Sequence, residues 1–182
     1  MSNWDADTAQ WYADNYGEYD TNRWGIEALS LPQTVTVVDI GCGTGCALRH
    51  AAKRVTSGKL IGVDPIPRMI EIAEESTNDG RISYKVGPAE QVPIDSGIAD
   101  IVLAFDSFDH WQDQHKGLAE VKRLLKSDGL FVVTKDGGVP KGDKSRQTFL
   151  NMLVEAGFEL ANEQAITQDD ISFTMWKCVL VA

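Results

Sequence analysis

Short apolar runs recur along the chain from residue 34 onward, and they predict the strands of a sheet. Each run has the length of a strand and most are rich in β-branched residues. The runs are 34–40, 59–64, 81–87, 99–106 and 130–136. They are continuously apolar rather than alternating, which is typical of strands that are buried on both faces of a sheet.

The segments between these runs carry apolar residues at helical spacing. The predicted helices are 44–55, 67–77 and 112–129. We expect Gly129 to close the last of them in the left-handed conformation. Repeated alternation of strand and helix predicts crossover units, and therefore an α/β fold with a doubly wound, mostly parallel sheet.

The C-terminal part has a different pattern. Residues 144–166 predict a helix that ends at Gly157 and is followed by a strand, and residues 171–182 predict a last strand. Because only a short turn separates these two strands, they must pair in antiparallel fashion. The sheet is therefore expected to be parallel except at its C-terminal end.

The segment 1–34 precedes the first strand and is dense in aromatic and acidic residues. It predicts an N-terminal helical segment, with the remainder, 35–182, forming the main domain. Tyr12 and Tyr16 lie one helical turn apart, so they are the best candidates for a lid over a ligand. The alternative is a helix that packs its aromatic stripe on the edge of the sheet.

Composition narrows the function classes. The 182 residues are 43% hydrophobic and 24% charged, which is typical of one globular domain, and the net charge of −10 argues against nucleic-acid binding and against anionic membranes. No apolar run is long enough to span a bilayer. Three cysteines predict no disulfide framework and favour a cytoplasmic location. The three histidines lack metal-ligand spacing, so we expect no metal site.

The stretch "VVDIGCGTG" suggests the chemistry. Gly41, Gly43 and Gly45 directly follow a predicted strand, and glycines there allow a ligand to lie against the backbone. Asp64 ends the next strand, where an acid can accept hydrogen bonds from the hydroxyls of a ribose. Asp39 precedes the loop and would repel a pyrophosphate, whereas it would attract a cationic amine or sulfonium.

Two other nucleotide sites are disfavoured. The dinucleotide pattern GxGxxG needs a third glycine where this chain has Cys46, which argues against a nicotinamide oxidoreductase. A phosphate-binding Walker loop is excluded, because no Gly-Lys-Ser/Thr follows the glycines. The residues therefore favour S-adenosyl-L-methionine. Cys42 is interpreted as a small loop residue rather than a nucleophile.

With "GVDPIPRMIEIA", "ADIVLAFDSFDHW" and "LAEVKRLLKSDGLFVV", this loop resembles the class I S-adenosylmethionine-dependent methyltransferases. The resemblance is to the small branch that includes ubiquinone/menaquinone-biosynthesis-type enzymes, and it extends from about Val35 to Lys135. It implies a Rossmann-like methyltransferase fold with seven strands, the last of them antiparallel. It also implies methyl transfer from S-adenosyl-L-methionine to an acceptor.

The resemblance implies a set of cofactor-binding residues. They are Asp39, Gly41, Cys42, Gly43, Gly45, Asp64, Pro65, Ala89, Glu90 and Phe105. Asp39 and the Gly41 backbone would hold the methionine amine, Asp64 the ribose, and Pro65 or Ile66 the adenine. Phe105 would offer its carbonyl to the amine and its ring to the cofactor.

One position departs from the family pattern. Relatives often carry Gly-Asp-Ala-Glu after the third strand, and the Asp side chain there reaches the adenine amino group. This chain has Pro88 in that place, within Gly87-Pro88-Ala89-Glu90. The Ala89 amide is left to meet the ring, and Glu90 is the candidate substitute for the lost side chain.

The cluster "DSFDHWQD" follows the strand that would end at the methyl donor. Asp106 and Trp111 are therefore candidates to line the acceptor site, and Asp109 or His110 is a candidate base. The alternative is a polar loop with Trp111 as a packing anchor. Residues 136–147 hold no long insertion, so the acceptor site is expected to be open, or completed by the N-terminal segment or a second subunit.

These patterns predict a methyltransferase that acts on a small-molecule acceptor, as a monomer or homodimer. A protein substrate stays open because the site is expected to lack a cover, and nucleic acid is disfavoured by the charge. The alternative from another class is a non-catalytic cofactor-binding protein or a partner subunit on the same scaffold.

Overall fold

The computed structural model describes residues 4–136 and 143–181 of the chain. The helices are α1 (Ala6–Tyr16), α2 (Asp20–Glu27), α3 (Cys46–Ala52), α4 (Pro67–Glu75), α5 (Gln114–Leu124) and α6 (Asp143–Glu155), with a short 3₁₀ turn η1 (Phe108–His110). The strands are β1 (Thr36–Ile40), β2 (Lys59–Asp64), β3 (Ile82–Val86), β4 (Ala99–Phe105), β5 (Leu125–Asp136), β6 (Phe158–Gln168) and β7 (Ile171–Leu180).

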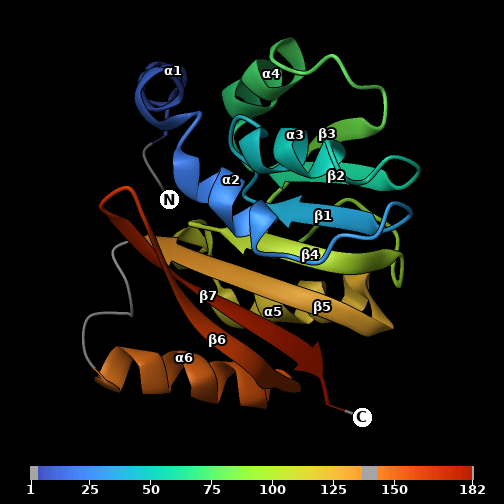
Figure 1. Cartoon of the computed structure of the whole chain (residues 1–182), viewed down its shortest axis with the longest axis vertical. Helices are drawn as coiled ribbons and strands as arrows, with labels where there is room; N and C mark the ends of the chain where they lie inside the picture. The colour runs from blue at the N-terminus through green and yellow to red at the C-terminus, as the bar shows by residue number, and fades with distance from the viewer. Residues whose placement is uncertain (1–3, 137–142, 182) are drawn as a thin grey trace.

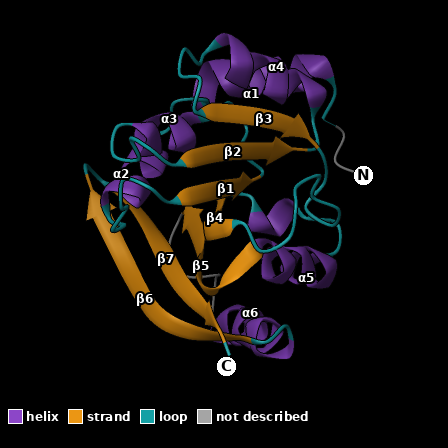
Figure 2. Cartoon of the chain, turned by 90° about the vertical axis from the view of Figure 1, so that its right-hand side faces the viewer, coloured by secondary structure: helices purple, strands orange, loops and turns teal. Residues whose placement is uncertain are grey.

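All described strands form one sheet in the order β3-β2-β1-β4-β5-β7-β6. The first five strands pair in parallel, and β7 runs antiparallel to both β5 and β6. Figures 1 and 2 show α2 and α3 on one face of the sheet and α5 and α6 on the other. The predicted doubly wound α/β fold is thereby confirmed.

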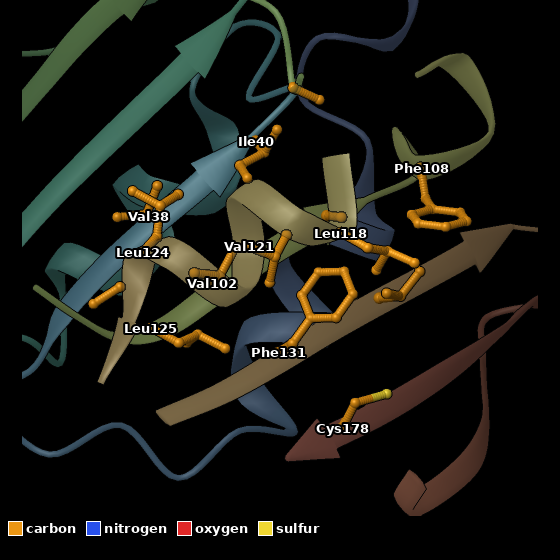
Figure 3. Close-up of a cluster of buried hydrophobic side chains, with 14 of the residues drawn as sticks. Val38, Ile40, Val102, Phe108, Leu118, Val121, Leu124, Leu125, Phe131 and Cys178 are labelled. Atoms are coloured by element: carbon orange, nitrogen blue, oxygen red, sulfur yellow. The ribbon is translucent and has the colours of Figure 1, made fainter. Parts of the chain in front are cut away.

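The larger core cluster lies between the sheet and α5 and α6. In Figure 3 the side chains of Val38 and Val102 from the central strands meet Leu118 and Val121 of α5, with Phe131 of β5 beside them. These five residues are buried. Continuous apolar strands thus bury both faces, as their sequence predicted.

The second core cluster lies on the opposite face and includes the N-terminal segment. Trp24 and Ile26 of α2 are buried there with Leu48 of α3 and Phe105 of β4. A Cβ on Gly25 would come within 2.7 Å of the Phe105 ring, so α2 lies very close to the end of β4. The segment 1–34 therefore contributes core residues, and its role as a separate lid stays a prediction.

The prediction for Gly129 is wrong. Helix α5 ends at Leu124, and Leu125 is already extended and paired with Ala99 in β5. The register then shifts before Ile101, so the residues up to Gly129 form an irregularity in the strand. A Cβ on Gly129 would lie 2.8 Å from a methyl of Leu125, which makes close packing the reason for the glycine.

The glycine after α6 behaves as predicted. Gly157 has φ +85° and follows the helix end at Glu155. Its left-handed backbone directs the chain from α6 into β6. The antiparallel hairpin of β6 and β7 then completes the sheet.

Candidate functional site

The glycine loop joins β1 to α3 at the carboxyl edge of the sheet. Gly41 and Gly43 have φ values of +77° and +50°, a region that favours glycine. A Cβ on Gly41 would collide with Ser107, whose hydroxyl donates a hydrogen bond to the Ile40 carbonyl over 2.6 Å. A Cβ on Gly43 would meet no described atom within 4 Å. Gly43 is therefore the glycine whose bare backbone faces open space.

Asp39 lies beneath this loop and is 2% exposed. Its Oδ1 is buried and has no hydrogen-bond partner within the described residues. Burial, together with the nearby charge of Asp64, raises the pKa of the Asp39 carboxyl to about 7. A buried carboxylate with an unused acceptor atom fits a cationic group supplied from outside the chain.

Asp64 ends β2 and turns its carboxylate toward the glycine loop. Its Oδ2 accepts a hydrogen bond from the Gly43 amide at 3.0 Å, and its Oδ1 accepts one from the Ile66 amide at 2.9 Å. Burial raises the pKa of Asp64, and these two hydrogen bonds oppose that shift. Asp64 therefore braces the loop, and each oxygen keeps a lone pair for a ribose hydroxyl.

The glycine loop opens into a cavity of about 260 Å³. Its walls come from the loop, from the end of β4 and from the N-terminal segment. The lining residues are Tyr12, Tyr16, Gly17, Tyr19, Asn22, Gly41, Cys42, Gly43, Thr44, Cys46, Phe105 and Asp106. We call this space the donor cavity, after the methyl donor that the sequence predicts for this loop. It brings together the predicted lid residues Tyr12 and Tyr16 with the predicted loop residues.

A hydrogen bond and an ion pair connect the N-terminal segment directly to the glycine loop and helix α3. The Thr44 hydroxyl donates a hydrogen bond to the Gly17 carbonyl over 2.6 Å, within the protein interior. Arg49 donates to the Thr44 carbonyl at 2.5 Å and forms an ion pair with Glu18. We call these contacts the Thr44 latch. No sequence pattern indicated it, because its partners lie in two segments that the fold alone brings together.

A second cavity, of about 720 Å³, lies beside the first. Its lining residues are Tyr12, Asp106, Phe108, Asp109, His110, Gln114, Val133, Thr134, Lys135, Ser145, Thr148, Phe149, Met152 and Trp176. We call this space the acceptor cavity, after the methyl acceptor that the sequence predicts beside the loop. Tyr12 and Asp106 line both cavities, so the two spaces meet at these side chains.

The predicted base candidates both line the acceptor cavity. Asp109 forms an ion pair with Lys135, a residue that the sequence did not single out. His110 forms no ion pair among the described residues, and both roles stay predictions.

Trp111 lies beneath the cavity wall rather than in the lining. Its ring packs against Phe108 at a centroid distance of 4.8 Å and stacks on Phe131 at 6.5 Å. A Cβ on Gly117 would collide with the Trp111 ring, so α5 packs closely on it. This arrangement matches the packing-anchor alternative for Trp111.

The residues expected near an adenine lie away from the two cavities. Pro65 is exposed, and Ala89 is buried in the core cluster. Glu90 accepts a hydrogen bond from the Asp113 amide at 2.8 Å, ahead of α5. In this arrangement the Glu90 carboxylate braces α5, and its substitution for the missing family aspartate stays a prediction.

A group of three potential metal ligands lies beside the latch. Glu18, Cys46 and His50 place ligand atoms within 4.8 Å of one another. The Glu18 carboxylate already forms an ion pair with Arg49. Burial raises the pKa of the Cys46 thiol to about 12. The described geometry therefore favours an ion pair beside a protonated thiol over a metal site.

The fold and the site define a Rossmann-like protein that binds its ligand beyond the carboxyl ends of parallel strands. A family model described as a methyltransferase domain matches residues 38–133, over half of the chain. The chain belongs to this family, the class I S-adenosylmethionine-dependent methyltransferases. Across the described residues, no helix combines the length and the apolar character needed to cross a bilayer.

Individual relatives agree with this assignment. The ubiquinone/menaquinone biosynthesis C-methyltransferase UbiE of Citrifermentans bemidjiense is 34% identical over 116 residues, which cover 61% of this chain and 49% of that protein. The chain thus spans about half the length of this curated relative. A SAM-dependent methyltransferase from Aquifex aeolicus superposes with a TM-score of 0.79 at 18% identity, covering 97% of this chain and all of that one.

A further structural relative comes from an assembly. A chain of the Haloferax volcanii complex that contains the Trm112 methyltransferase activator has a TM-score of 0.79 at 20% identity, covering 97% of this chain and 94% of that chain. At such identities the likeness establishes the shared fold alone.

Proposed function

We propose that the protein transfers the methyl group of S-adenosyl-L-methionine to a small-molecule acceptor. The observation that carries this proposal is the pair of adjoining cavities at the carboxyl edge of the sheet. The smaller adjoins the glycine loop and the larger holds polar and aromatic side chains, and they share Tyr12 and Asp106. Two spaces that meet at one point suit a donor and an acceptor held in line.

The glycine loop and the two buried acids next to it suit the methionine and ribose parts of the cofactor. Asp39 supplies a buried carboxylate oxygen for the cationic amine, and Gly43 leaves room against the backbone. Asp64 would hold the ribose hydroxyls while it braces the Gly43 amide. When bound, S-adenosyl-L-methionine supplies an electrophilic methyl group on a sulfonium.

The acceptor cavity favours a small molecule that is partly aromatic or apolar. Phe108, Phe149 and Trp176 form one wall, and adjacent ring centroids are 5.3 Å apart. His110 and the Asp109–Lys135 ion pair supply polar contacts. The protein would align the acceptor, exclude water and accept a proton where the acceptor must lose one.

A second candidate is a cofactor-binding protein without catalytic activity. It is favoured by the adenine end of the site, where Pro88 replaces the family aspartate and Glu90 is engaged by Asp113. A partner subunit is a variant of this candidate, and the Haloferax volcanii relative, with its activator complex, motivates testing for one.

Calorimetry and a turnover assay test the proposal. We expect S-adenosyl-L-methionine to bind with a stoichiometry near one, and a panel of small aromatic alcohols and amines to include one that releases S-adenosylhomocysteine. Mass spectrometry of ligands that copurify gives an independent measurement. Absence of cofactor binding would refute both candidates, and binding without turnover across the panel would favour the second.

A further inference from the structure

Asp106 occupies the point where the two cavities meet. It is the first residue after β4, and only Tyr12 shares with it the property of lining both cavities among the described residues. On the proposed function, the donor sulfonium lies in the smaller cavity and the acceptor in the larger. The methyl group must then pass beside the Asp106 side chain.

The backbone of Asp106 is held in an unusual conformation. Its φ is +50°, in the left-handed region that non-glycine residues seldom adopt. The contacts that keep it there include a hydrogen bond from the Asp106 amide to the Thr134 carbonyl at 3.1 Å and one from the Thr21 hydroxyl to Asp106 Oδ2 at 3.3 Å. A residue kept in such a conformation at the border of two cavities is a candidate for a role in the site.

We propose that Asp106 recognises the positive charge of the methyl donor and so distinguishes S-adenosyl-L-methionine from its neutral product. A carboxylate beside the sulfonium attracts the charged donor, and it gains little from the uncharged thioether that remains after transfer. The difference favours exchange of the product for a new donor. This inference rests on the proposed function and adds a residue that determines specificity.

Asp109 provides a matched comparison. It is the other carboxylate that lines the acceptor cavity, three residues further along the chain. Asp109 does not line the donor cavity, and Lys135 neutralises its charge. Replacing Asp109 by Asn and Lys135 by Gln together removes this ion pair without a change of net charge, and it leaves the Asp106 carboxylate in place.

The test compares three ligands by calorimetry on the full chain. These are S-adenosyl-L-methionine, S-adenosylhomocysteine, and sinefungin, in which an amine-bearing carbon replaces the sulfur and places a positive charge near the methyl position. We expect the two cationic ligands to bind the natural protein at least about tenfold more tightly than the neutral one, because a carboxylate attracts a nearby positive charge inside a cavity more strongly than in bulk water. Asp106→Asn should reduce this ratio to near one, whereas the charge-neutral double variant Asp109→Asn, Lys135→Gln should keep it.

The substitution is chosen to preserve the fold, because Asn tolerates the left-handed conformation. Asp106→Gly is a second variant that suits the same backbone and also removes the carboxylate. Equal binding of the three ligands to the natural protein would overturn the proposal, and so would a ratio that survives in both variants. If S-adenosylhomocysteine and both cationic ligands fail to bind the natural protein, the proposed function fails; if they bind with equal affinity, only this inference does.

Discussion

Asp39 is an ionisable residue that is almost completely buried. Burying its charge lowers the free energy of unfolding unless a cationic ligand pairs with the carboxylate. Its carboxyl has an unused acceptor atom and a raised pKa of about 7 because of burial and the neighbouring Asp64. The unliganded site therefore stores an unfavourable interaction, and a cationic amine would relieve it. Stability and ligand affinity should respond in opposite directions when this carboxylate is removed.

The first prediction concerns Asp39→Asn and pH. The folded pKa of about 7 lies above the ordinary value of 3.8, so the folded state binds more protons than the unfolded state between these two values. The protonated Asp39 carboxyl therefore contributes its full stability at low pH, and this contribution is lost as the pH rises through about 7. Each pKa unit between the folded and unfolded states corresponds to about 1.4 kcal/mol in the free energy of unfolding. The variant should therefore gain several degrees in Tm over the natural protein at pH 8 and much less at pH 4.5.

Thermal melts at the two pH values measure this effect, and calorimetry should show at least tenfold weaker S-adenosyl-L-methionine binding. Asp100→Asn is a suitable comparison because, although burial opposes it, the ion pair with Lys126 holds the pKa of Asp100 below its ordinary value. That variant should lose rather than gain stability at pH 8. A Tm gain for Asp39→Asn that is equal at both pH values would contradict the prediction.

The second prediction separates the roles of two glycines. A side chain at Gly41 would collide with Ser107, whereas one at Gly43 would enter open space. Both residues have positive φ, so each Ala substitution carries a backbone cost of about 1–2 kcal/mol. Gly41→Ala should lose clearly more stability in denaturant melts than Gly43→Ala.

The affinity for S-adenosylhomocysteine should rank the two variants in a different order from their stability. Gly43→Ala would place a methyl group where the ligand approaches the backbone, so we expect a loss of S-adenosylhomocysteine affinity larger than its loss of stability suggests. Affinity for the folded fraction of each variant is measured by calorimetry. Unchanged affinity in Gly43→Ala would show that the ligand does not lie against this backbone.

At the scale of elements, the Thr44 latch couples the N-terminal helices to the glycine loop. The latch contains one buried hydrogen bond, from Thr44 to the Gly17 carbonyl, and one ion pair, between Arg49 and the exposed Glu18. Arg68 of α4 adds a contact by donating to Gln10 of α1 at 2.8 Å. The donor cavity is complete only when α1 is seated, because Tyr12 and other wall residues come from this segment.

The third prediction ranks the two parts of the latch. Thr44→Val should destabilise the protein by about 1–3 kcal/mol, because it leaves the buried Gly17 carbonyl without this donor. Glu18→Gln should change stability by less than about 1 kcal/mol, as is typical of exposed ion pairs. Thr44→Val should also weaken S-adenosylhomocysteine binding and make α1 more sensitive to proteolysis.

Limited proteolysis with and without S-adenosylhomocysteine measures the coupling between the segment and the ligand. We expect the ligand to protect α1 in the natural protein and to protect it less in Thr44→Val. If S-adenosylhomocysteine leaves the rate of cleavage in α1 unchanged in both the natural protein and Thr44→Val, the N-terminal segment is a fixed part of the fold rather than a lid.

At the scale of the whole molecule, the net charge of −10 disfavours the binding of acceptors that carry many phosphates. Nucleic-acid binding gains most of its affinity from lysine and arginine contacts to phosphates, and this chain has an excess of carboxylates. We therefore expect no shift of double-stranded DNA or tRNA at about 50 mM salt in a mobility assay. Binding that weakens steeply with added salt would contradict the small-molecule proposal.

Much of the fold could be predicted because its signals are local. Apolar runs and helical spacing located the elements, and the short turn before residue 171 indicated the antiparallel pairing. The error at Gly129 arose because a glycine after a helical pattern resembles a cap, whereas packing against Leu125 and a shift of strand register decided its conformation. The register shift arises in the pairing with strand β4, which is remote in sequence from the helical pattern before Gly129.

The site was predictable in part for the same reason. The loop residues and Asp39 are adjacent in sequence, and Asp64 follows from the rule that ligands lie beyond the ends of parallel strands. Lys135, Thr44 and Arg49 were missed, since each acquires its role from a partner that is remote along the chain.

The amino-acid sequence by itself determined the α/β class, the glycine loop and the family, because periodicity and motif spacing depend on neighbouring residues. The tertiary structure alone decided that Tyr12 and Asp106 line both cavities and that the partly buried Trp111 packs against Phe108 and Phe131. It also decided that Glu90 faces α5 and that the N-terminal helices close one wall of the donor cavity. These features depend on which distant side chains the folded chain brings into contact, and no local pattern encodes them.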